Sequence, residues 1–451
     1  MIHRRPEKKV PHGRDRSRKT LWGWVLYDCG NSAFATTIMA GFFPVFFKNY
    51  WSYQSDINTS TAMLGFGNAL AGLLVALMAP LLGAIADNRA SKKGHLAIFA
   101  GLGCTMTFLL FFPEKGQWPF AILFYALAVI GFSGANSFYD ALLPSVTTPE
   151  KIDYVSSLGY AVGYLGGGLL FAFNVLMVTM PSRFGLASPE QAVRISFLTV
   201  AVWWAAFTII TLRWVPPEVK PKALFSGAFI EGFRKIASTL KTVRQFKSAW
   251  LFLMAYWFYI DGVDTIIRMA VDYGLSLGFQ ATDLIIALLI VQFIGFPAAL
   301  AFGKLGERWG ARKAIFLGIY LYMGITIWGA LMSRKEEFFL LAALIGLVQG
   351  GIQALSRSYF TRLIPKHQAA EFFGFYNMVG KFAAILGPAL VGSTGILVRR
   401  LIMPVSPTET QERYFAHLAS RWSMASLLIL FLVGLFLFHL VGKEESRSFT
   451  T

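Results

Sequence analysis

The stretch GAIADNRASKK at residues 83–93 returns 220 residues later as GKLGERWGARK at residues 303–313. Both copies contain a glycine, an acidic residue four positions after it, and a cluster of basic residues. Each copy lies at the end of an apolar run that is long enough to cross a membrane. A repeat of this kind indicates that a structural unit is duplicated within the chain.

Further pairs of similar segments occur at matching places on either side of the middle of the chain. They are YDCGNS (27–32) with IDGVDT (260–265), and Leu143-Pro144 with Ile364-Pro365. The sequence therefore predicts two equivalent six-helix bundles at residues 21–215 and 249–443, each 195 residues long. The remaining segments are a basic tail (1–20), a linker (216–248) and a short tail (444–451).

Composition predicts that these bundles lie in a membrane. Apolar residue types make up 55% of the 451 residues and charged types only 14%, against ~25% charged residues in soluble domains. So few charges cannot cover a water-exposed surface, which excludes the soluble globular and disordered classes. The apolar runs are far longer than the ~10-residue strands of a membrane barrel, and only helices or closed barrels satisfy their backbone in lipid. We therefore expect an all-α integral membrane protein with twelve spans, at residues 21–47, 61–86, 95–112, 118–143, 155–180, 194–215, 249–273, 281–303, 311–332, 337–363, 371–398 and 419–441.

The net charge of +17 results from 41 Lys and Arg against 24 Asp and Glu. With both termini inside, the cytoplasmic segments hold about 29 basic residues and the outer loops about 10. This bias follows the positive-inside rule, so the charge indicates an inner membrane face and not a nucleic-acid partner. We expect a multi-pass protein of the bacterial inner membrane with both termini in the cytoplasm.

The linker carries a second periodic pattern, because apolar residues recur at spacings of three and four with basic residues on the other face. The apolar positions are Phe225, Phe229, Phe233, Ile236, Leu240 and Val243, and the basic ones are Arg234, Lys235, Lys241 and Arg244. This pattern is typical of an amphipathic helix at a membrane surface. Such a helix is either a plain tether between the halves or a regulatory element.

Six charged residues lie deep within the predicted spans: Asp28, Asp261, Asp264, Arg268, Arg357 and Lys381. A charge at the bilayer centre costs at least ~2.5–3.5 kcal/mol on insertion scales, so it usually marks a pathway or a partner. Helical spacing places them, together with neutral polar residues, on single faces of spans 1, 7, 8, 10 and 11. The neutral residues are Asn31, Gln292, Gln349, Gln353 and Asn377. We predict that these faces line a central substrate cavity between the two halves.

Two interpretations of the six charges remain open. In the functional one, a substrate with an ammonium and a carboxylate group meets an Asp and a Lys or Arg, and a carboxylate shielded from water takes up a proton. In the structural one, three acids and three bases neutralise one another and fix the helix packing. Arg357 lies nearer the cytoplasmic end, which favours the structural interpretation for this residue.

The repeated motif between spans 2 and 3 and between spans 8 and 9 resembles that of the major facilitator superfamily. Three longer stretches resemble one family within it, the "unknown major facilitator" family, which includes a fungal vacuolar amino-acid effluxer linked to autophagy. They are WVLYDCGNSAFATTI (24–38), IDGVDTIIRMAVDYG (260–274) and GLVQGGIQALSRSYFTRLIPKHQAAEFFGFYNMVGKFAAILGP (346–388). The resemblance implies the major facilitator fold, alternating access and a monomer, and it favours amino-acid export.

The superfamily resemblance also implies a gate formed by the repeated motif. Its expected residues are Gly83, Asp87, Arg89, Asp140, Gly303, Glu307, Arg308 and Gly310. The glycines allow helices to approach closely, the acids can interact with the positive N-terminal end of a neighbouring helix, and Arg89 is placed to pair with Asp140. Together they would latch the halves in an outward-open state. The alternative is that these loops only anchor the chain at the inner membrane face.

The leading functional hypothesis is a secondary transporter for an amino acid or a related zwitterion, with efflux favoured and proton coupling possible. The alternatives are a lipid, lysolipid or other metabolite transporter of the same fold, and a membrane receptor that senses a substrate. An enzyme is not expected, because no histidine reaches mid-membrane depth and no catalytic cluster is apparent. No cofactor or metal is expected either, since Cys29 and Cys104 lie in apolar spans without ligand spacing and the nucleotide-binding loop motif is missing.

Overall fold

Long apolar runs separated by short polar segments form helices throughout the part of the chain that the structure describes. The structure is a computed structural model that describes residues 14–53, 92–216, 241, 243–276, 280–402 and 408–441. Every element in these residues is helical, so the prediction of an all-α fold is confirmed. Nine helices among the described residues are long and apolar enough to cross a membrane. The second predicted span (61–86) and most of the predicted amphipathic linker lie outside the described residues.

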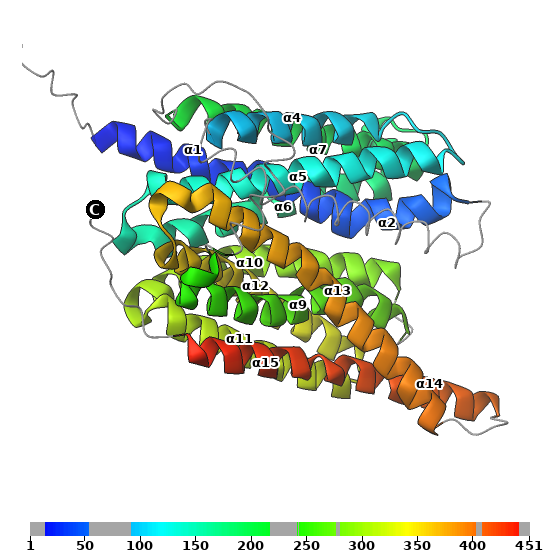
Figure 1. The fold of residues 1–451 in the computed structure, drawn as a ribbon. Helices are drawn as coiled ribbons and strands as arrows, with labels where there is room; N and C mark the ends of the chain where they lie inside the picture. The colour runs from blue at the N-terminus through cyan, green and yellow to red at the C-terminus, as the bar shows by residue number, and fades with distance from the viewer. Residues whose placement is uncertain are drawn as a thin grey trace, which may run out of the picture.

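The helices of the N-terminal half form the upper bundle in Figure 1. The first span is a composite of α-helical and π-helical segments, and four further long helices follow it. These elements are α1 (Arg14–Ala33), η1 (Phe34–Phe42), α2 (Phe43–Phe46), η2 (Phe47–Trp51), α4 (Lys92–Leu109), α5 (Trp118–Val146), α6 (Ile152–Thr179) and α7 (Pro189–Trp214). Two short 3₁₀ turns, η3 (Pro149–Lys151) and η4 (Pro181–Phe184), flank α6.

The helices of the C-terminal half form the lower bundle in Figure 1. They are α9 (Lys247–Ser276), α10 (Ala281–Trp309), α11 (Ala311–Leu331), α12 (Lys335–Leu363), the turn η5 (Lys366–Gln368), α13 (Ala369–Ile402), α14 (Glu409–Ser426) and α15 (Leu428–Leu440). The predicted last span, residues 419–441, corresponds to the end of α14 together with α15. Helix α14 begins ten residues before this predicted span because Thr408 caps it by accepting a hydrogen bond from the Gln411 amide.

The first span departs from a regular α-helix beside Pro44. The π-helical segment η1 ends just before Pro44, and the Phe43 amide donates to the Ile38 carbonyl five residues back. Proline has no N–H to offer to the carbonyl four residues earlier, so a wider turn keeps the surrounding backbone groups bonded. The segment also sets Thr36 at the boundary between the two halves, where it accepts a hydrogen bond from Gln292.

The two halves meet along a seam between α6 and α10, which run antiparallel. Small residues set the spacing: a Cβ at Gly303 would lie 2.6 Å from the Ser157 Cβ, and one at Gly295 would lie 2.9 Å from the Tyr164 ring. Helix α6 also packs on α12, and α5 packs on α13. Because small residues let backbones approach closely in a bilayer, this seam brings polar groups of opposite halves within bonding distance.

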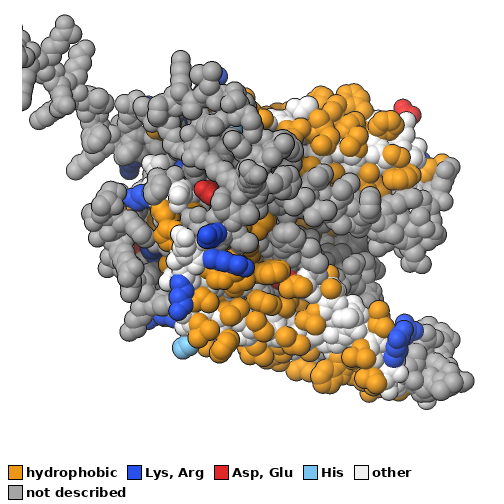
Figure 2. All heavy atoms as spheres, viewed as in Figure 1, with side chains coloured by type: hydrophobic (Ala, Val, Ile, Leu, Met, Phe, Trp, Pro, Cys, Tyr) orange, Lys and Arg blue, Asp and Glu red, His pale blue; other side chains and the backbone are white. Residues whose placement is uncertain are grey.

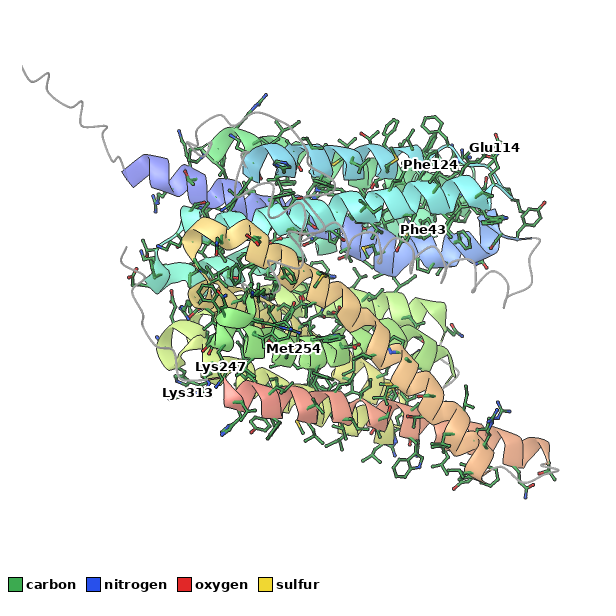
Figure 3. The ribbon with its side chains drawn as sticks, viewed as in Figure 1. Phe43, Glu114, Phe124, Lys247, Met254 and Lys313 are labelled. Carbon is green, nitrogen blue, oxygen red and sulfur yellow. The ribbon has the colours of Figure 1, made fainter. Side chains whose placement is uncertain are left out.

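Large apolar side chains cover the outside of the bundles, as a lipid-facing surface requires. Among them are Phe120 (55% exposed), Leu331 (68%) and Phe436 (64%). Figure 2 shows hydrophobic side chains over the flank of the C-terminal half, with Lys and Arg side chains towards its ends. Lys247 and Lys313, at the starts of α9 and α11, lie at the same end of the molecule, while Glu114 lies at the opposite end (Figure 3).

Candidate functional site

A buried arginine of the C-terminal half reaches into the N-terminal half. Arg357, on α12, is only 2% exposed. Its Nη1 donates to Asp140 Oδ1 at 3.0 Å, and its Nη2 lies 3.7 Å from Asp28 Oδ2. Its Nε and Nη2 donate to the hydroxyl and the carbonyl of Ser156 at 2.9 and 2.8 Å. One guanidinium therefore ties α12 to α1, α5 and α6.

Three aromatic rings surround the same guanidinium. The Arg357 Cζ lies 4.5 Å from the ring centroid of Tyr160, 4.9 Å from that of Trp24 and 5.4 Å from that of Tyr139. All three distances are within the range at which a cation is attracted to an aromatic face. Together with Asp28, Asp140 and Ser156, these rings form what we call the arginine cage, and each of its members belongs to the N-terminal half.

The cage is held in shape by contacts of its own. Tyr139 donates its hydroxyl proton to Asp28 Oδ2 at 2.8 Å, and Trp24 Nε1 donates to the Tyr139 carbonyl at 2.9 Å. The rings of Trp24 and Tyr139 stack with centroids 4.4 Å apart. Gly159 leaves room for the carboxylate, since a Cβ there would lie 2.7 Å from Asp28 Oδ2. These contacts give the cage a fixed shape in this conformation.

Further bonds join the halves around the cage. Arg362 donates to Asp153 Oδ2 at 2.7 Å, between α12 and the start of α6. Ser156 Oγ donates to the Ala354 carbonyl at 2.8 Å, and Asn377 Nδ2 lies 3.3 Å from Asp140 Oδ2. We call these bonds and the arginine cage the basal network. It lies at the end of the molecule where α6 begins and α5 and α12 end.

A cavity of about 230 Å³ lies further along the seam, towards the end of the molecule opposite the basal network. It is mostly walled by α9, α10, α11 and α12, with η1 of the other half on one side. Its lining residues are Ala35, Thr36, Ala40, Ile266, Ile267, Ala270, Tyr273, Leu284, Ala287, Leu288, Val291, Gln292, Ile325, Thr326, Gly329, Met332, Phe338, Leu341, Ala342, Ile345, Gln349 and Met424. The cavity is therefore largely apolar, with a few polar groups.

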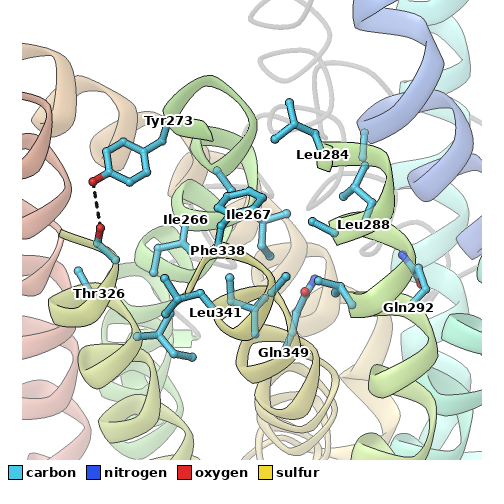
Figure 4. A pocket seen from close by; sticks show the side chains of 18 of the residues that line it. Ile266, Ile267, Tyr273, Leu284, Leu288, Gln292, Thr326, Phe338, Leu341 and Gln349 are labelled. Atoms are coloured by element: carbon cyan, nitrogen blue, oxygen red, sulfur yellow. Dashed lines mark hydrogen bonds between the residues drawn. The ribbon is translucent and has the colours of Figure 1, made fainter. Parts of the chain in front are cut away.

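Two glutamines supply much of the polarity of the cavity (Figure 4). Gln292 Nε2 donates to the Thr36 hydroxyl at 2.9 Å, a bond between α10 and η1 that joins the two halves. Gln349 Oε1 is buried and has no hydrogen-bond partner among the described atoms. Tyr273 is already engaged, because its hydroxyl donates to the Gly329 carbonyl at 2.9 Å.

Asp261 occupies the position in the second copy of the repeat that Asp28 occupies in the first, and it is held within its own half. Its Oδ1 accepts from the Gly387 amide at 2.9 Å and from Thr265 Oγ1 at 3.2 Å, and its Oδ2 is buried without a partner among the described atoms. Asp264 on the next turn is half-buried and has a partner of its own. The side chains of Arg268 and Lys381 lie outside the described residues.

The structure thus separates residues that the sequence assigns to one cavity. Gln292 and Gln349 line it, but none of the charged residues with a described side chain (Asp28, Asp261, Asp264 and Arg357) does. The reason is that Asp28, Asp261 and Arg357 bond to other helices, while aliphatic side chains fill the walls. Asn31 bonds Asn136 within its own half at 2.6 Å, and Gln353 is half-buried outside the lining.

The predicted gate residues are placed as follows. Gly303 packs on Ser157 at the seam, while Glu307 and Arg308 are exposed at the end of α10. Gly310 has a φ of 87°, which favours glycine, and separates α10 from α11. The carboxylate of Asp140, the predicted partner of Arg89, bonds Arg357 and Asn377 among the described residues. Gly83, Asp87 and Arg89 lie outside the described residues.

Sequence reasoning missed most of the partners of Arg357. Trp24, Tyr139 and Tyr160 look like ordinary apolar bulk in a sequence that is 16% aromatic. One signal was present, because Trp24 and Asp28 are four residues apart and therefore share a helix face. The pair of Asp153 and Arg362 was missed as well, since their proximity depends on how the halves dock.

Comparisons with known proteins agree with this fold. The family model described as "Vacuole effluxer Atg22 like" matches residues 52–395. The uncharacterized MFS-type transporter YxiO of Bacillus subtilis is 37% identical over 428 residues, covering 94% of this chain and 95% of that protein. Autophagy-related protein 22-1 of Penicillium rubens is 27% identical over 263 residues, covering 53% of this chain and 44% of that protein.

Solved structures show the same fold at low sequence identity. The human organic anion transporter MFSD10 aligns with a TM-score of 0.68 at 12% identity, covering 95% of this chain and all of that chain. At this identity the likeness concerns the fold alone. It matches the major facilitator architecture that the internal repeat predicts.

Proposed function

The chain belongs to the Atg22-like family of major facilitator transporters, and we propose that it is a secondary transporter that exports an amino acid or a related zwitterion. Transport would proceed by alternating access, in which the two halves rock around a solute held between them. The membership supports the transporter assignment directly. The choice of solute and the direction of transport are our inference.

The observation that carries the proposal is that ionic bonds between the halves lie at one end of the seam, while a largely apolar cavity lies towards the other end. The basal network joins the halves at one end through buried ionic bonds, and a cavity lies towards the other end. A transporter that opens to one side at a time needs such a reversible closure on one side of its solute. The bonds of Arg357 and Arg362 can break and re-form without any change in the fold of either half.

The cavity suits a small solute that has both polar and apolar parts. About 230 Å³ accommodates one small molecule, and aliphatic side chains form most of its wall. Gln292, Gln349, Thr36 and Thr326 line the cavity with amide and hydroxyl groups, which can hydrogen-bond the polar part of such a solute. Asp28 and Asp261 are the carboxylates that we assign to proton coupling.

Orientation follows from the basic residues. Lys247 and Lys313 lie at the end of the C-terminal half where α9 and α11 begin (Figure 3). We propose that this end faces the cytoplasm of a bacterial cell, because basic loops stay inside. The basal network would then close the cytoplasmic side, and the present conformation would face outward.

Flux measurements test the proposal. Purified protein is reconstituted into liposomes loaded with single amino acids, and counterflow of the labelled solute is followed with and without a proton gradient. We expect counterflow for a subset of amino acids and none in protein-free liposomes. Ligand-dependent thermal stabilisation without any counterflow would instead indicate a receptor, and it would refute the transporter proposal.

A lipid-like solute is the second candidate, and a hollow on the outer side of the C-terminal half favours it. This hollow of about 520 Å³ is lined by apolar side chains of α10, α11 and α12. Ile325 lines both the hollow and the internal cavity, so the two adjoin at this side chain. If lysophospholipid, and no amino acid, gives counterflow in the same liposomes, this candidate replaces the first.

A further inference from the structure

We propose that the arginine cage is a binding site for organic cations that the protein's own Arg357 occupies in this conformation. The ligand class is a guanidinium or alkylammonium head group. Arg357 acts as a tethered ligand, so a free cation and the side chain compete for the same place. The inference rests on the geometry of the cage and does not require the proposed amino-acid substrate.

The chemistry of the cage is that of a cation site. Tyr160, Trp24 and Tyr139 approach the guanidinium with centroids at 4.5, 4.9 and 5.4 Å. Asp140 and Asp28 add two carboxylates, at 3.0 and 3.7 Å from its nitrogens. Aromatic faces combined with acidic groups are how proteins recognise ammonium and guanidinium ions.

Trp24, Tyr139 and Asp28 are held in the cage without any contribution from Arg357. The stack of Trp24 on Tyr139 and the hydroxyl bond from Tyr139 to Asp28 are contacts within the N-terminal half. Gly159, also in that half, leaves the space that the Asp28 carboxylate needs. A cage that is formed by one half keeps its shape when the other half moves, which lowers the cost of binding a new cation.

The occupant, in contrast, comes from the opposite half. Arg357 extends from α12, and α12 packs on α6 across the seam. When the halves part at this end, Arg357 withdraws and leaves two carboxylates and three rings without their cation. A free cation that enters the cage then binds only the parted state, so it must shift the population towards that state.

The control for this idea is provided by the second ionic bond of the basal network. Arg362 pairs with Asp153 at 2.7 Å, also across the seam. The Arg362 side chain is 24% exposed, against 3% for that of Arg357, and Arg362 does not belong to the arginine cage. Removing Arg362 therefore also breaks an ionic bond between the halves, but it leaves Arg357 in the cage.

The experiment uses the full-length protein in nanodiscs and methylguanidinium chloride as the probe. Thermal unfolding is followed for the wild type, Arg357→Ala and Arg362→Ala over a millimolar range of the probe, with sodium chloride at matched ionic strength. We expect a saturable rise in unfolding temperature for Arg357→Ala, with an apparent Kd at least about tenfold below that of the wild type. Arg362→Ala should behave like the wild type.

A second variant keeps the test decisive if Arg357→Ala does not fold. Arg357→Gln retains part of the side-chain volume and polarity but no charge, so it should also gain a saturable response. Methylammonium and urea are run beside methylguanidinium, and urea, which is neutral, should have no saturable effect. The proposal is overturned if neither Arg357 variant responds, or if Arg362→Ala responds equally. Transport is not measured, so failure here leaves the proposed function untouched.

Discussion

Asp28 and Asp261 occupy the same place in the internal repeat, yet the two halves use them differently. Asp28 faces across the seam, where the Arg357 guanidinium of the other half lies 3.7 Å away. Asp261 turns inward, where the Gly387 amide and the Thr265 hydroxyl of its own half hold it. The comparison teaches that a duplicated sequence motif can serve a joint between halves in one copy and the packing of a single half in the other.

The largest effect is expected on removing Arg357, the residue that makes the surroundings of Asp28 differ from those of Asp261. Arg357→Ala leaves Asp28 and Asp140 buried without their cation, and removing one partner of a buried pair costs about 3–5 kcal/mol. We expect the halves to part at the basal network, as measured by the distance between spin labels at Lys151 and Lys366. Arg362→Ala should cause a smaller change in that distance. An unchanged distance distribution for Arg357→Ala would show that the cage does not hold the halves together.

Neutralising each aspartate in turn measures how much more its charge contributes to stability at Asp28 than at Asp261. Asp28→Asn removes the charge that faces Arg357 and that accepts a hydrogen bond from the Tyr139 hydroxyl. A hydrogen bond to a charged group contributes roughly 1.5–3 kcal/mol, so the free energy of unfolding should fall by about this amount. Asp261→Asn keeps an oxygen for the Gly387 amide, so its free energy of unfolding should change by less than about 1 kcal/mol. Chemical denaturation of both variants in nanodiscs measures the difference, and equal losses would contradict it.

Transport by the Asp261 variant gives a separate answer. If Asp261 takes part in proton coupling, Asp261→Asn should transport at a reduced rate although it remains stable. Lys381→Ala tests the predicted cavity lysine in the same reconstituted vesicles. Wild-type transport by both variants would remove these charges from the mechanism and leave them a structural role.

The glycines beside the two aspartates provide a matched pair of smaller changes. A Cβ at Gly159 would lie 2.7 Å from Asp28 Oδ2, and one at Gly387 would lie 2.7 Å from Asp261 Oδ1. Each alanine substitution should therefore destabilise the protein by about 1–3 kcal/mol through overpacking. Gly392→Ala on α13 is the control, because no atom lies within 4 Å of the added Cβ. Only Gly159→Ala should also loosen the basal network.

A small effect on stability is also expected where the cavity meets η1 of the other half. Gln292→Leu removes the bond to Thr36, and a neutral hydrogen bond contributes about 0.5–1.5 kcal/mol. We expect a modest fall in unfolding temperature and a changed affinity for the transported solute, measured by counterflow. If Gln292→Leu is instead as damaging as Arg357→Ala, the halves are held at the cavity and not at the basal network.

The sequence was sufficient to predict the helical membrane fold and the family. Each span must be apolar and each loop polar, so short stretches of sequence are enough to place the spans. The repeated motif shows in the same way that the two halves are related. The ends of helices were less predictable, as α14 illustrates, where a cap at Thr408 starts the helix in polar sequence. The π-helical turn before Pro44 was not predicted, since its register depends on how the backbone adjusts to a missing donor.

The candidate site was predictable only as a set of buried polar residues. Spacing placed Arg357 and Asp28 in the membrane, but their pairing depends on the docking of α12 against α1 and α6. Tyr160 and Trp24 carry no charge and so gave no signal of their own. The apolar character of the cavity was missed because the aliphatic residues that line it are indistinguishable in sequence from those that face lipid.

The π-helical segment η1 allows the two ends of the first span to rotate about the helix axis relative to each other. In η1 the hydrogen bonds reach back five residues and not four, as from the Phe43 amide to the Ile38 carbonyl, so each hydrogen-bonded ring encloses one residue more than in an α-helix. A slip of that one extra residue along the helix rotates the side chains beyond it by about 100° while every slipped amide finds a new carbonyl. The parts of the first span on either side of η1 can therefore rotate relative to each other. The part that contains Asp28 can then follow one half of the molecule while the part from Thr36 onwards follows the other.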